Sequence, residues 1–193
     1  MGYPHPIPVN SPARTLLIVG LGGIGMETAK RAAGFGMRVM ATRRHTDRPK
    51  PDFVDSVHPP EALHDLLPQA DWVDVPLPLT ADTRDLISDR EFALMKDGVH
   101  ITNVGREYVI NLEALMRALD SGKVGGAGLD VLGREAQDFS HPIWKYENII
   151  ITPHASGHGQ AAFDRLGDLV KDNIRRFITD EPLRNVVDLD LEY

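Results

Sequence analysis

A glycine-rich segment near the start of the chain restricts the fold more than any other feature. Residues 20–25 read GLGGIG and match the pattern G-x-G-x-x-G. The segment follows the apolar run TLLIV and leads into METAKRAAGF, which has a helical pattern. Glycines of an ordinary tight turn are the alternative, but they do not require a strand before and a helix after. In this context the pattern indicates a dinucleotide-binding βαβ unit.

Each position of this loop has a physical role in such a unit. Gly20 permits the tight turn, Gly22 lets the backbone approach a diphosphate, and Gly25 lets the helix pack close to the strand. Gly23 and Ile24 lie at the helix N-terminus, where free N–H groups and the helix dipole attract anions. We therefore expect all five residues to contact a dinucleotide.

The end of the second predicted strand bears on which dinucleotide is bound. An NAD-binding fold places an acidic residue there, about 20 positions after the glycines. This chain instead has Thr42, Arg43 and Arg44, and its nearest carboxylate is Asp47. Two arginines suit a 2′-phosphate, although a solvated basic turn would have the same sequence. The sequence thus predicts NADP(H) in preference to NAD(H).

Short apolar runs alternate with amphipathic segments along the rest of the chain. This alternation predicts an α/β fold with a doubly wound parallel sheet of the Rossmann type and a long C-terminal helix. We expect strands at residues 15–19, 38–41, 72–75, 99–102, 124–129 and 148–151. We expect helices near residues 24–35, 60–67, 89–95, 112–119 and 160–179.

The same patterns suggest how the chain divides. Residues 1–14 contain four prolines and are expected to form an extended leader. Residues 15–155 form the predicted dinucleotide-binding domain. Residues 156–193 hold the last helix and a tail, interpreted as the remnant of a substrate domain.

Composition excludes several classes of function. The chain has no cysteine, which removes disulfides, thiolate metal sites and a cysteine nucleophile. A net charge of −7 argues against binding to nucleic acid or to anionic membranes. We find no segment of the length that a membrane helix needs and no signal peptide, so we expect a cytoplasmic protein.

Several segments in order resemble one enzyme family. They are VGLGGIGMETAKRAAGFGMRV, PLPLTADTRDLI, LMKDGVHITNVGRE, SGKVGGAGLDV and NIIITPHASG. On these motifs the chain resembles the D-isomer-specific 2-hydroxyacid dehydrogenases, especially the NADP-using glyoxylate and hydroxypyruvate reductase type. The resemblance implies hydride transfer between NADP(H) and a 2-keto or 2-hydroxy acid, or a related carbonyl.

The resemblance also implies site residues. The catalytic arginine falls on Arg106, its carboxylate partner on Glu135 and the histidine on His154. Asp130 falls where relatives have an aspartate near the nicotinamide carboxamide. Further cofactor contacts are expected at Pro78, Thr83 and Val104.

The expected chemistry needs these residue types. Hydride addition to a keto acid places negative charge on the carbonyl oxygen, to which a histidine can deliver a proton. A glutamate beside the histidine orients its ring, and arginine's planar fork suits a substrate carboxylate. His154 and His158 also form an H-x-x-x-H pair, but no further ligand-rich segment accompanies it, so we expect no metal site.

The chain departs from the family in several places. Glu107, Asn111 and Ala136 stand where relatives have glycine, aspartate and proline. A side chain of Glu107 that pointed inward would weaken the binding of a substrate carboxylate. Only about fourteen residues precede the first strand, so most of the family's substrate domain is missing.

The missing domain leaves three functions open. The first is a reductase. The second is a truncated nucleotide-binding module that acts as sensor, scaffold or partner subunit. The third is a repurposed non-redox enzyme with an opened site. The apolar face of the last helix has lost its usual partner, so we expect a homo-oligomer, most simply a homodimer, formed through that helix. A small-molecule substrate is the other expected partner.

Overall fold

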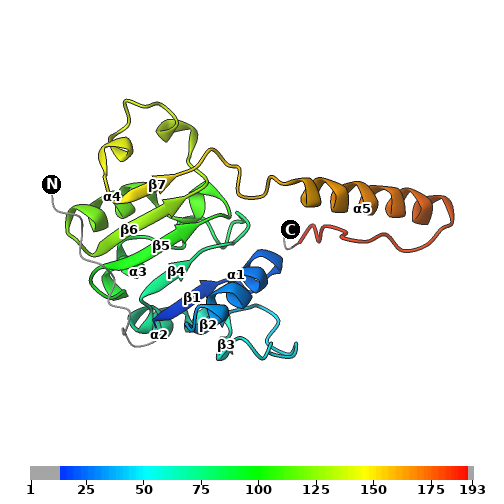
Figure 1. Cartoon of the computed structure of the whole chain (residues 1–193), viewed down its shortest axis with the longest axis horizontal. Coiled ribbons are helices and arrows are strands. Elements are labelled where there is room, and N and C mark those ends of the chain that lie inside the picture. The colour runs from blue at the N-terminus through cyan, green and yellow to red at the C-terminus, as the bar shows by residue number, and fades with distance from the viewer. Residues whose placement is uncertain (1–13, 191–193) are drawn as a thin grey trace.

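The computed structural model describes residues 14–190 and contains one parallel sheet (Figure 1). The strands are β1 (Thr15–Val19), β2 (Arg38–Thr42), β3 (Ser56–His58), β4 (Trp72–Asp74), β5 (Val99–Asn103), β6 (Val124–Leu129) and β7 (Ile149–Ile151). Their order is β3-β2-β1-β4-β5-β6-β7, and every neighbouring pair is parallel. This is the Rossmann order with one further strand. The predicted fold class and its six strands are confirmed.

β3 is the strand that the sequence did not predict. It has three half-buried residues at the sheet edge and lacks an apolar run. Its position is set by pairing with β2, where Met40 lies opposite Ser56. The carboxylate of Asp55 also accepts a 2.7 Å hydrogen bond from the N–H of Val39. Tertiary contacts therefore make this strand, which a local pattern cannot reveal.

The helices lie close to the predicted positions. They are α1 (Gly23–Gly34), α2 (Leu63–Leu66), α3 (Asp89–Leu94), α4 (Leu112–Asp120) and α5 (Gln160–Ile178). The expected helix over residues 60–67 is less regular, because α2 is flanked by two 3₁₀ turns that each contain proline near their start. None of the helices in residues 14–190 is long and apolar enough to cross a membrane.

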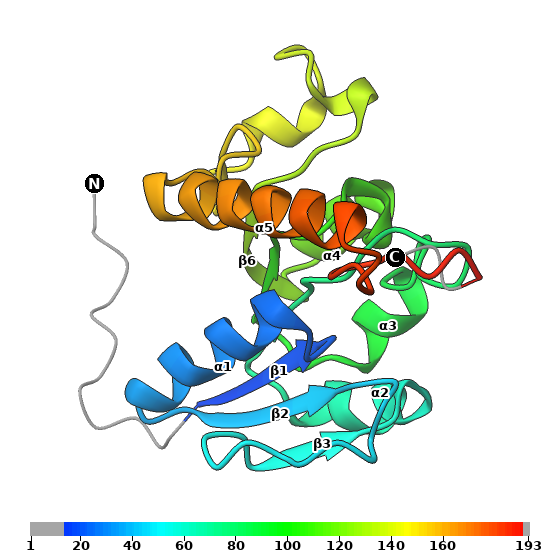
Figure 2. The same cartoon turned by 90° about the vertical axis from the view of Figure 1, so that its right-hand side faces the viewer.

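Helices cover the two faces of the sheet unequally. On one face, side chains from β1, β2, β4, β5, β6 and β7 form the large core with α2, α3 and α4. On the other face, α1 packs against β1 and β2 (Figure 2), and Trp72 of β4 packs against this smaller core. On this side Asp74 of β4 is 4% exposed and lies beside Thr28 of α1, so α1 reaches as far as β4. Ile150 of β7, on that face, is 72% exposed.

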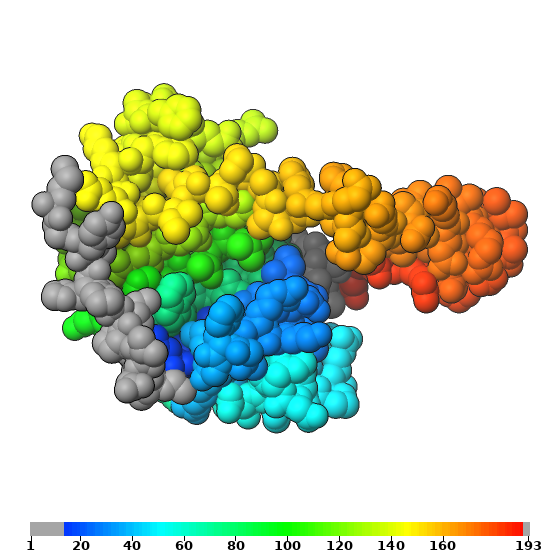
Figure 3. Space-filling view, viewed as in Figure 1, coloured from blue at the N-terminus to red at the C-terminus, as the bar shows by residue number. Residues whose placement is uncertain are grey.

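α5 stands apart from this body. None of its 19 residues is buried, although its pattern is amphipathic. Figure 3 shows the helix and the residues after it extending away from the sheet. An exposed apolar stripe runs along the helix. It consists of Phe163, Leu166, Val170, Ile174 and Phe177.

Three loops pack together at the carboxyl ends of the central strands. Gly20, after β1, has φ of +109°, and a Cβ there would lie 2.6 Å from the Leu77 side chain. Gly105, after β5, lies so close to the same residue that a Cβ would be 2.4 Å from the Leu77 carbonyl oxygen. Leu77, after β4, therefore fixes the spacing between the loops that follow β1 and β5.

This packing makes Gly105→Ala a test of the loop arrangement. The added methyl group would meet backbone atoms of Leu77, which cannot rotate away. We expect a loss of about 1–3 kcal/mol in the free energy of unfolding, as for other overpacked sites. Gly34→Ala, at an open position near the end of α1, should change stability by less than about 1 kcal/mol. Denaturant titration of both variants measures this, and equal stabilities would contradict the packing argument.

Candidate functional site

The glycine loop is held by the end of β2. The N–H of Leu21 donates to the carbonyl oxygen of Thr42 at 2.8 Å, and the N–H of Gly20 donates to the Thr42 hydroxyl at 3.2 Å. Gly25 sits so close to the strand that a Cβ would lie 2.4 Å from the Gly20 carbonyl oxygen. These contacts bring the N-terminus of α1 to the carboxyl edge of the sheet.

The N-terminus of α1 has the features of an anion site. No side chain caps it, and its first turn holds no acidic residue. A Cβ at Gly22 or Gly23 would meet nothing within 4 Å, and Ile24 is exposed. The first N–H groups of a helix lack intrahelical partners. The loop therefore fits a dinucleotide diphosphate placed on the helix end.

The basic residues after β2 lie at one side of this loop. Thr42 is buried, and its hydroxyl is already used by Gly20. Arg43 donates from its guanidinium to the carbonyl of Arg48, while its buried Nε has no hydrogen-bond partner with acceptable geometry. Arg44 lies 3.5 Å from the carboxylate of Asp82. The Thr42 hydroxyl therefore holds the glycine loop, and Arg43 and Arg44 are the cationic side chains that follow it.

The loop after β4 is ordered by its own threonines. The Thr83 hydroxyl donates to the carbonyl of Pro78 at 2.7 Å and accepts from the N–H of Thr80 at 2.8 Å. The same loop carries Leu77, which lies against Gly20, and Asp82, which pairs with Arg44. It therefore connects the glycine loop to the basic residues after β2. Pro78 and Thr83 therefore lie in the loop that faces the dinucleotide edge.

Arg106 is presented by an asparagine to which the sequence assigned no role. Asn103 is 1% exposed and donates from Nδ2 to the carbonyl of Arg106 at 2.9 Å. Its Oδ1 accepts from the N–H of Gly105 at 3.0 Å. The two bonds close the turn that contains Val104, and Arg106 itself is exposed. An asparagine directly after a buried strand is the signal that could have identified this role.

Asp130 anchors the loop that carries the histidine. Its buried carboxylate accepts hydrogen bonds from the Thr152 hydroxyl and from the N–H groups of Ala155 and Ser156. Burial alone would raise the pKa of Asp130, but hydrogen bonds from Ser156, Thr152 and Ala155 outweigh it and hold the pKa far below its usual range. A charged Asp130 thus fixes residues 152–156 in place.

His154 lies at the bend of this anchored loop. Its φ is +53°, a left-handed conformation that is uncommon for residues other than glycine. Its side chain is exposed at the end of β7. His158 follows on the other side of the loop and lies near Phe163, with ring centroids 6.4 Å apart. Within residues 14–190, no group of three or more His, Asp and Glu side chains is placed to hold a metal.

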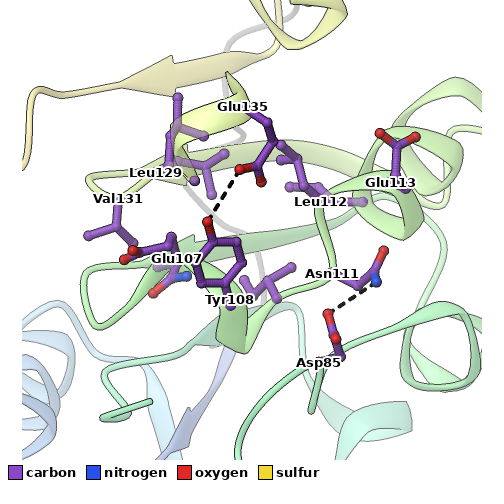
Figure 4. Close-up of a pocket in the computed structure, with 14 residues that line it drawn as sticks. Asp85, Glu107, Tyr108, Asn111, Leu112, Glu113, Leu129, Val131 and Glu135 are labelled. Carbon is purple, nitrogen blue, oxygen red and sulfur yellow. Dashed lines mark hydrogen bonds between the residues drawn. The ribbon is translucent and has the colours of Figure 1, made fainter. Parts of the chain in front are cut away.

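Glu135 does not meet His154 in this structure. Its carboxylate accepts a 3.3 Å hydrogen bond from the Tyr108 hydroxyl, as Figure 4 shows. It also occupies the space over Gly133, where a Cβ would lie 2.2 Å from Glu135 Oε1. The ring of Tyr108 is held in turn by the guanidinium of Arg84, 5.1 Å from its centroid. Neither a hydrogen bond nor an ion pair joins Glu135 to His154 in the described residues.

Glu135 and Glu107 line one pocket of about 210 Å³, to which Arg106 does not contribute (Figure 4). Asp85 and Glu113 complete its set of carboxylates. Glu107 thus does point into the pocket, next to Tyr108. This charge disfavours a carboxylate on a molecule bound in the pocket.

The other two departures from the family pattern have local structural roles. Asn111 caps α4 by accepting from the N–H of Ala114 at 2.9 Å, which asparagine and aspartate do equally well. The N–H of Ala136 donates to the carbonyl of Gly133 at 3.0 Å, a bond that proline could not make. That bond tightens the turn that folds Glu135 back over Gly133.

Comparison with known proteins agrees with this arrangement. Residues 5–156 match the model of the D-isomer specific 2-hydroxyacid dehydrogenase, NAD binding domain. A glyoxylate reductase of Korarchaeum cryptofilum is 36% identical over 176 residues, which is 90% of this chain and 52% of the relative. A glyoxylate reductase of Pyrococcus horikoshii is 35% identical over 85% of this chain and 48% of its own length. The chain therefore spans about half the length of these relatives.

Solved structures give the same result. A D-isomer specific 2-hydroxyacid dehydrogenase from Xanthobacter autotrophicus Py2, in complex with NADPH and MES, has a TM-score of 0.87 and 32% identity. That match covers 100% of this chain and 77% of the other. An NADPH-dependent glyoxylate/hydroxypyruvate reductase from Sinorhizobium meliloti, in complex with NADP and sulfate, has a TM-score of 0.86 and 28% identity, covering 97% and 60%. The chain belongs to the D-isomer specific 2-hydroxyacid dehydrogenase family, through its NAD-binding domain.

Proposed function

We propose that the protein is an oxidoreductase that transfers a hydride between NADP(H) and a 2-keto or 2-hydroxy acid, or a related carbonyl. The observation that carries the proposal is that four parts follow strands at the same, carboxyl edge of the parallel sheet. The glycine loop follows β1, Arg106 follows β5, Glu135 follows β6 and His154 follows β7. Ligands of open parallel sheets bind at this edge. One of the relatives named above, from Sinorhizobium meliloti, is described as an NADPH-dependent reductase.

The residues of this chain have distinct roles in the proposed reaction. A bound nicotinamide would supply the hydride that is added to the carbonyl carbon. His154 donates a proton to the carbonyl oxygen, on which negative charge develops. Arg106 holds the substrate carboxylate through two parallel N–H···O bonds. The remaining acceptor capacity of Asp130 suits a carboxamide N–H, and the same side chain keeps His154 in place.

Glu135 must turn before it can assist His154. In the structure its carboxylate is bound to Tyr108, so pairing with His154 requires that 3.3 Å hydrogen bond to break. This feature favours a second candidate, a nucleotide-binding module whose catalytic groups are no longer assembled. Glu107 in the pocket weakens the binding of a substrate carboxylate there, which favours the related carbonyls among the proposed substrates. The absence of cysteine fits a cytoplasmic setting, and residues 15–155 and 156–193 form the proposed domains.

The proposed function first predicts a preference between the two cofactors. Arg43 and Arg44 stand where an acidic residue would favour NAD, so NADPH should bind more tightly than NADH. A charge-assisted contact contributes about 1.5–3 kcal/mol, which corresponds to roughly a ten- to hundredfold difference in Kd. Titrations followed by nucleotide fluorescence measure both values.

The double variant Arg43→Ala, Arg44→Ala should remove this difference. Arg38→Ala, an exposed arginine at the opposite end of β2, is the matched control and should keep it. Equal affinities in the unaltered protein, or an unchanged preference in the double variant, would rule out the arginine site.

Catalysis is the second consequence. His154→Ala should reduce turnover with NADPH and a keto acid by about 10²–10⁴-fold, the usual contribution of a positioned acid. NADPH affinity should remain nearly unchanged, because the glycine loop and the arginines lie at other strands. Steady-state kinetics with a panel of small and bulky carbonyls gives the turnover.

His158→Ala is the control for this experiment, since His158 lies in the same segment but follows the anchored residues. It should keep full activity. Turnover that survives His154→Ala would disprove the proton-donor role. A chain that binds NADPH but oxidises it with no carbonyl would instead identify the nucleotide-binding module.

Self-association through α5 is the third consequence. The stripe defined above leaves two phenylalanines more than half exposed, and exposed stripes of this size mark interfaces. Light scattering should give a dimer or larger species at micromolar concentration. Leu166→Asp, in the stripe, should shift the population to monomer, whereas Ala161→Asp on the polar side should not. A monomer in the unaltered protein would refute the proposal.

A further inference from the structure

Tyr108 connects three loops at the carboxyl edge of the sheet. It lies in the 3₁₀ turn Glu107–Val109, which follows β5. Its hydroxyl donates to the carboxylate of Glu135, after β6, and its ring centroid lies 5.1 Å from the guanidinium of Arg84, after β4. Figure 4 shows the Tyr108 hydroxyl directed at Glu135. One side chain therefore joins the loop at the dinucleotide edge to the loop that carries the candidate catalytic carboxylate.

The backbone holds Tyr108 at this place. Its carbonyl oxygen accepts a 2.8 Å hydrogen bond from the N–H of Asp85, and the carbonyl of Val109 accepts a 3.1 Å bond from the N–H of Ile87. The N–H of Asn111 donates to the carbonyl of Ile87 at 2.9 Å. These bonds pair the segment after β4 with the segment after β5 in a short parallel ladder. The point from which Tyr108 projects its side chain is therefore set by the fold.

A glycine provides the space in which the Glu135 carboxylate lies. A Cβ at Gly133 would overlap this carboxylate, with only 2.6 Å to its Cδ atom. The backbone of Gly133 has φ of −57° and ψ of 156°, a conformation that other residues adopt without strain. The turn itself therefore does not require glycine at this position. What the glycine adds is room for the carboxylate to lie back over its own turn.

The other charges of the pocket act against this position of Glu135. Glu107, Asp85 and Glu113 line the same pocket, and like charges in one pocket repel each other. Within residues 14–190, the Tyr108 hydroxyl is the hydrogen-bond donor that the Glu135 carboxylate has. The phenol thus supplies an attraction that offsets the repulsion. Its loss would free the carboxylate to leave the pocket.

The loops that carry Glu135 and His154 follow neighbouring strands. Leu129 of β6 lies opposite Ile151 of β7 in the register of the sheet. Asp130, the next residue after β6, accepts hydrogen bonds from the histidine loop and keeps the two loops in contact. The loops are thus joined at their base, so a carboxylate that leaves its pocket can pair with a histidine on the adjacent loop.

We propose that Tyr108 holds Glu135 in a resting position over Gly133, apart from the histidine loop. Tyr108 is then a positioning residue for the proposed reaction, since it limits how often the carboxylate pairs with His154. A carboxylate beside the imidazole stabilises its protonated form, which is the form that donates a proton. Loss of the Tyr108 hydroxyl should therefore raise turnover, whereas loss of a purely structural contact would lower it. The inference rests on the proposed hydride transfer and names a residue that controls it.

Tyr108→Phe tests this directly, because it removes the hydroxyl and keeps the ring that Arg84 contacts. The rate at which a keto acid or related carbonyl oxidises bound NADPH in a single turnover should rise about two- to tenfold, the population change that one ordinary hydrogen bond produces. The Kd for NADPH should stay the same, since Tyr108 follows β5 and the glycine loop follows β1. Tyr146→Phe is the matched control, because its hydroxyl also donates to a carboxylate, that of Asp120 at the end of α4. It should leave the rate unchanged.

Two further variants show whether the gain depends on Glu135. Adding Glu135→Gln to Tyr108→Phe should remove the gain, so that the double variant matches Glu135→Gln alone. Gly133→Ala should raise the rate by a different route, because its methyl group fills the space of the resting carboxylate. This variant should fold normally, since the atoms that it displaces are the end of a flexible side chain.

The imidazole of His154 reports the same movement without turnover. Its NMR signals, identified by their loss in His154→Ala, should titrate at higher pH in Tyr108→Phe and in Gly133→Ala than in the unaltered protein. The direction follows because a nearby carboxylate stabilises the imidazolium. Adding Glu135→Gln to either variant should cancel the difference.

The outcomes separate this inference from the proposed reaction. A rate that falls in Tyr108→Phe, or a gain that persists without the Glu135 carboxylate, would overturn the inference. Unchanged rates with an unchanged histidine titration would also overturn it, while the proposed reaction would stand if His154→Ala loses turnover. NADPH oxidation by none of the proteins, together with the change in the histidine titration, would refute the proposed reaction and support the resting position of Glu135.

Discussion

The close approach of Gly25 to the carbonyl oxygen of Gly20 determines where α1 begins, and the rest of the site depends on it. A side chain at Gly25 would push the helix away from β1, and one at Gly20 would collide with the Leu77 side chain. With glycine at both, the end of α1 meets the carboxyl edge of the sheet, and Thr42 and Leu77 can contact the same loop. Leu77 then places the turn that bears Arg106. One backbone contact thus sets the distance between the dinucleotide site and the catalytic side.

The sequence predicted those parts of the fold that depend on local pattern. Continuous apolar runs identified the buried strands, because a strand covered by core residues has no polar alternation. It missed β3, which exists through pairing with β2, and it could not reveal that α5 stays exposed instead of covering a face of the sheet. Coverage of a face depends on where distant helices pack. The orientation of Glu135 was equally hidden, since it follows from the contact with Tyr108 and the space over Gly133.

The departures from the family pattern differ in their consequences. Asn111 and Ala136 keep or strengthen local structure, one as a helix cap and the other as the donor that closes a turn. Glu107 changes the electrostatics, because it adds a carboxylate to a pocket that already contains Glu135. A residue of similar geometry can take over a hydrogen bond, as Asn111 does at the start of α4. An added negative charge, by contrast, changes which ligands the pocket can bind. The site is therefore altered at Glu107 more than at the other two positions.

Because Asp130 anchors the histidine loop, the last helix can move without moving that loop. Its hydrogen bonds reach as far as Ser156, and the next three residues include two glycines with open space around them. Rotation at those glycines can move α5 without moving His154, because the strained bend at His154 is held by a charged carboxylate in the core. The last helix can thus change its direction while His154, the proposed proton donor, stays at the end of β7. Because the chain is anchored before these glycines, an exposed helix is compatible with a fixed histidine loop.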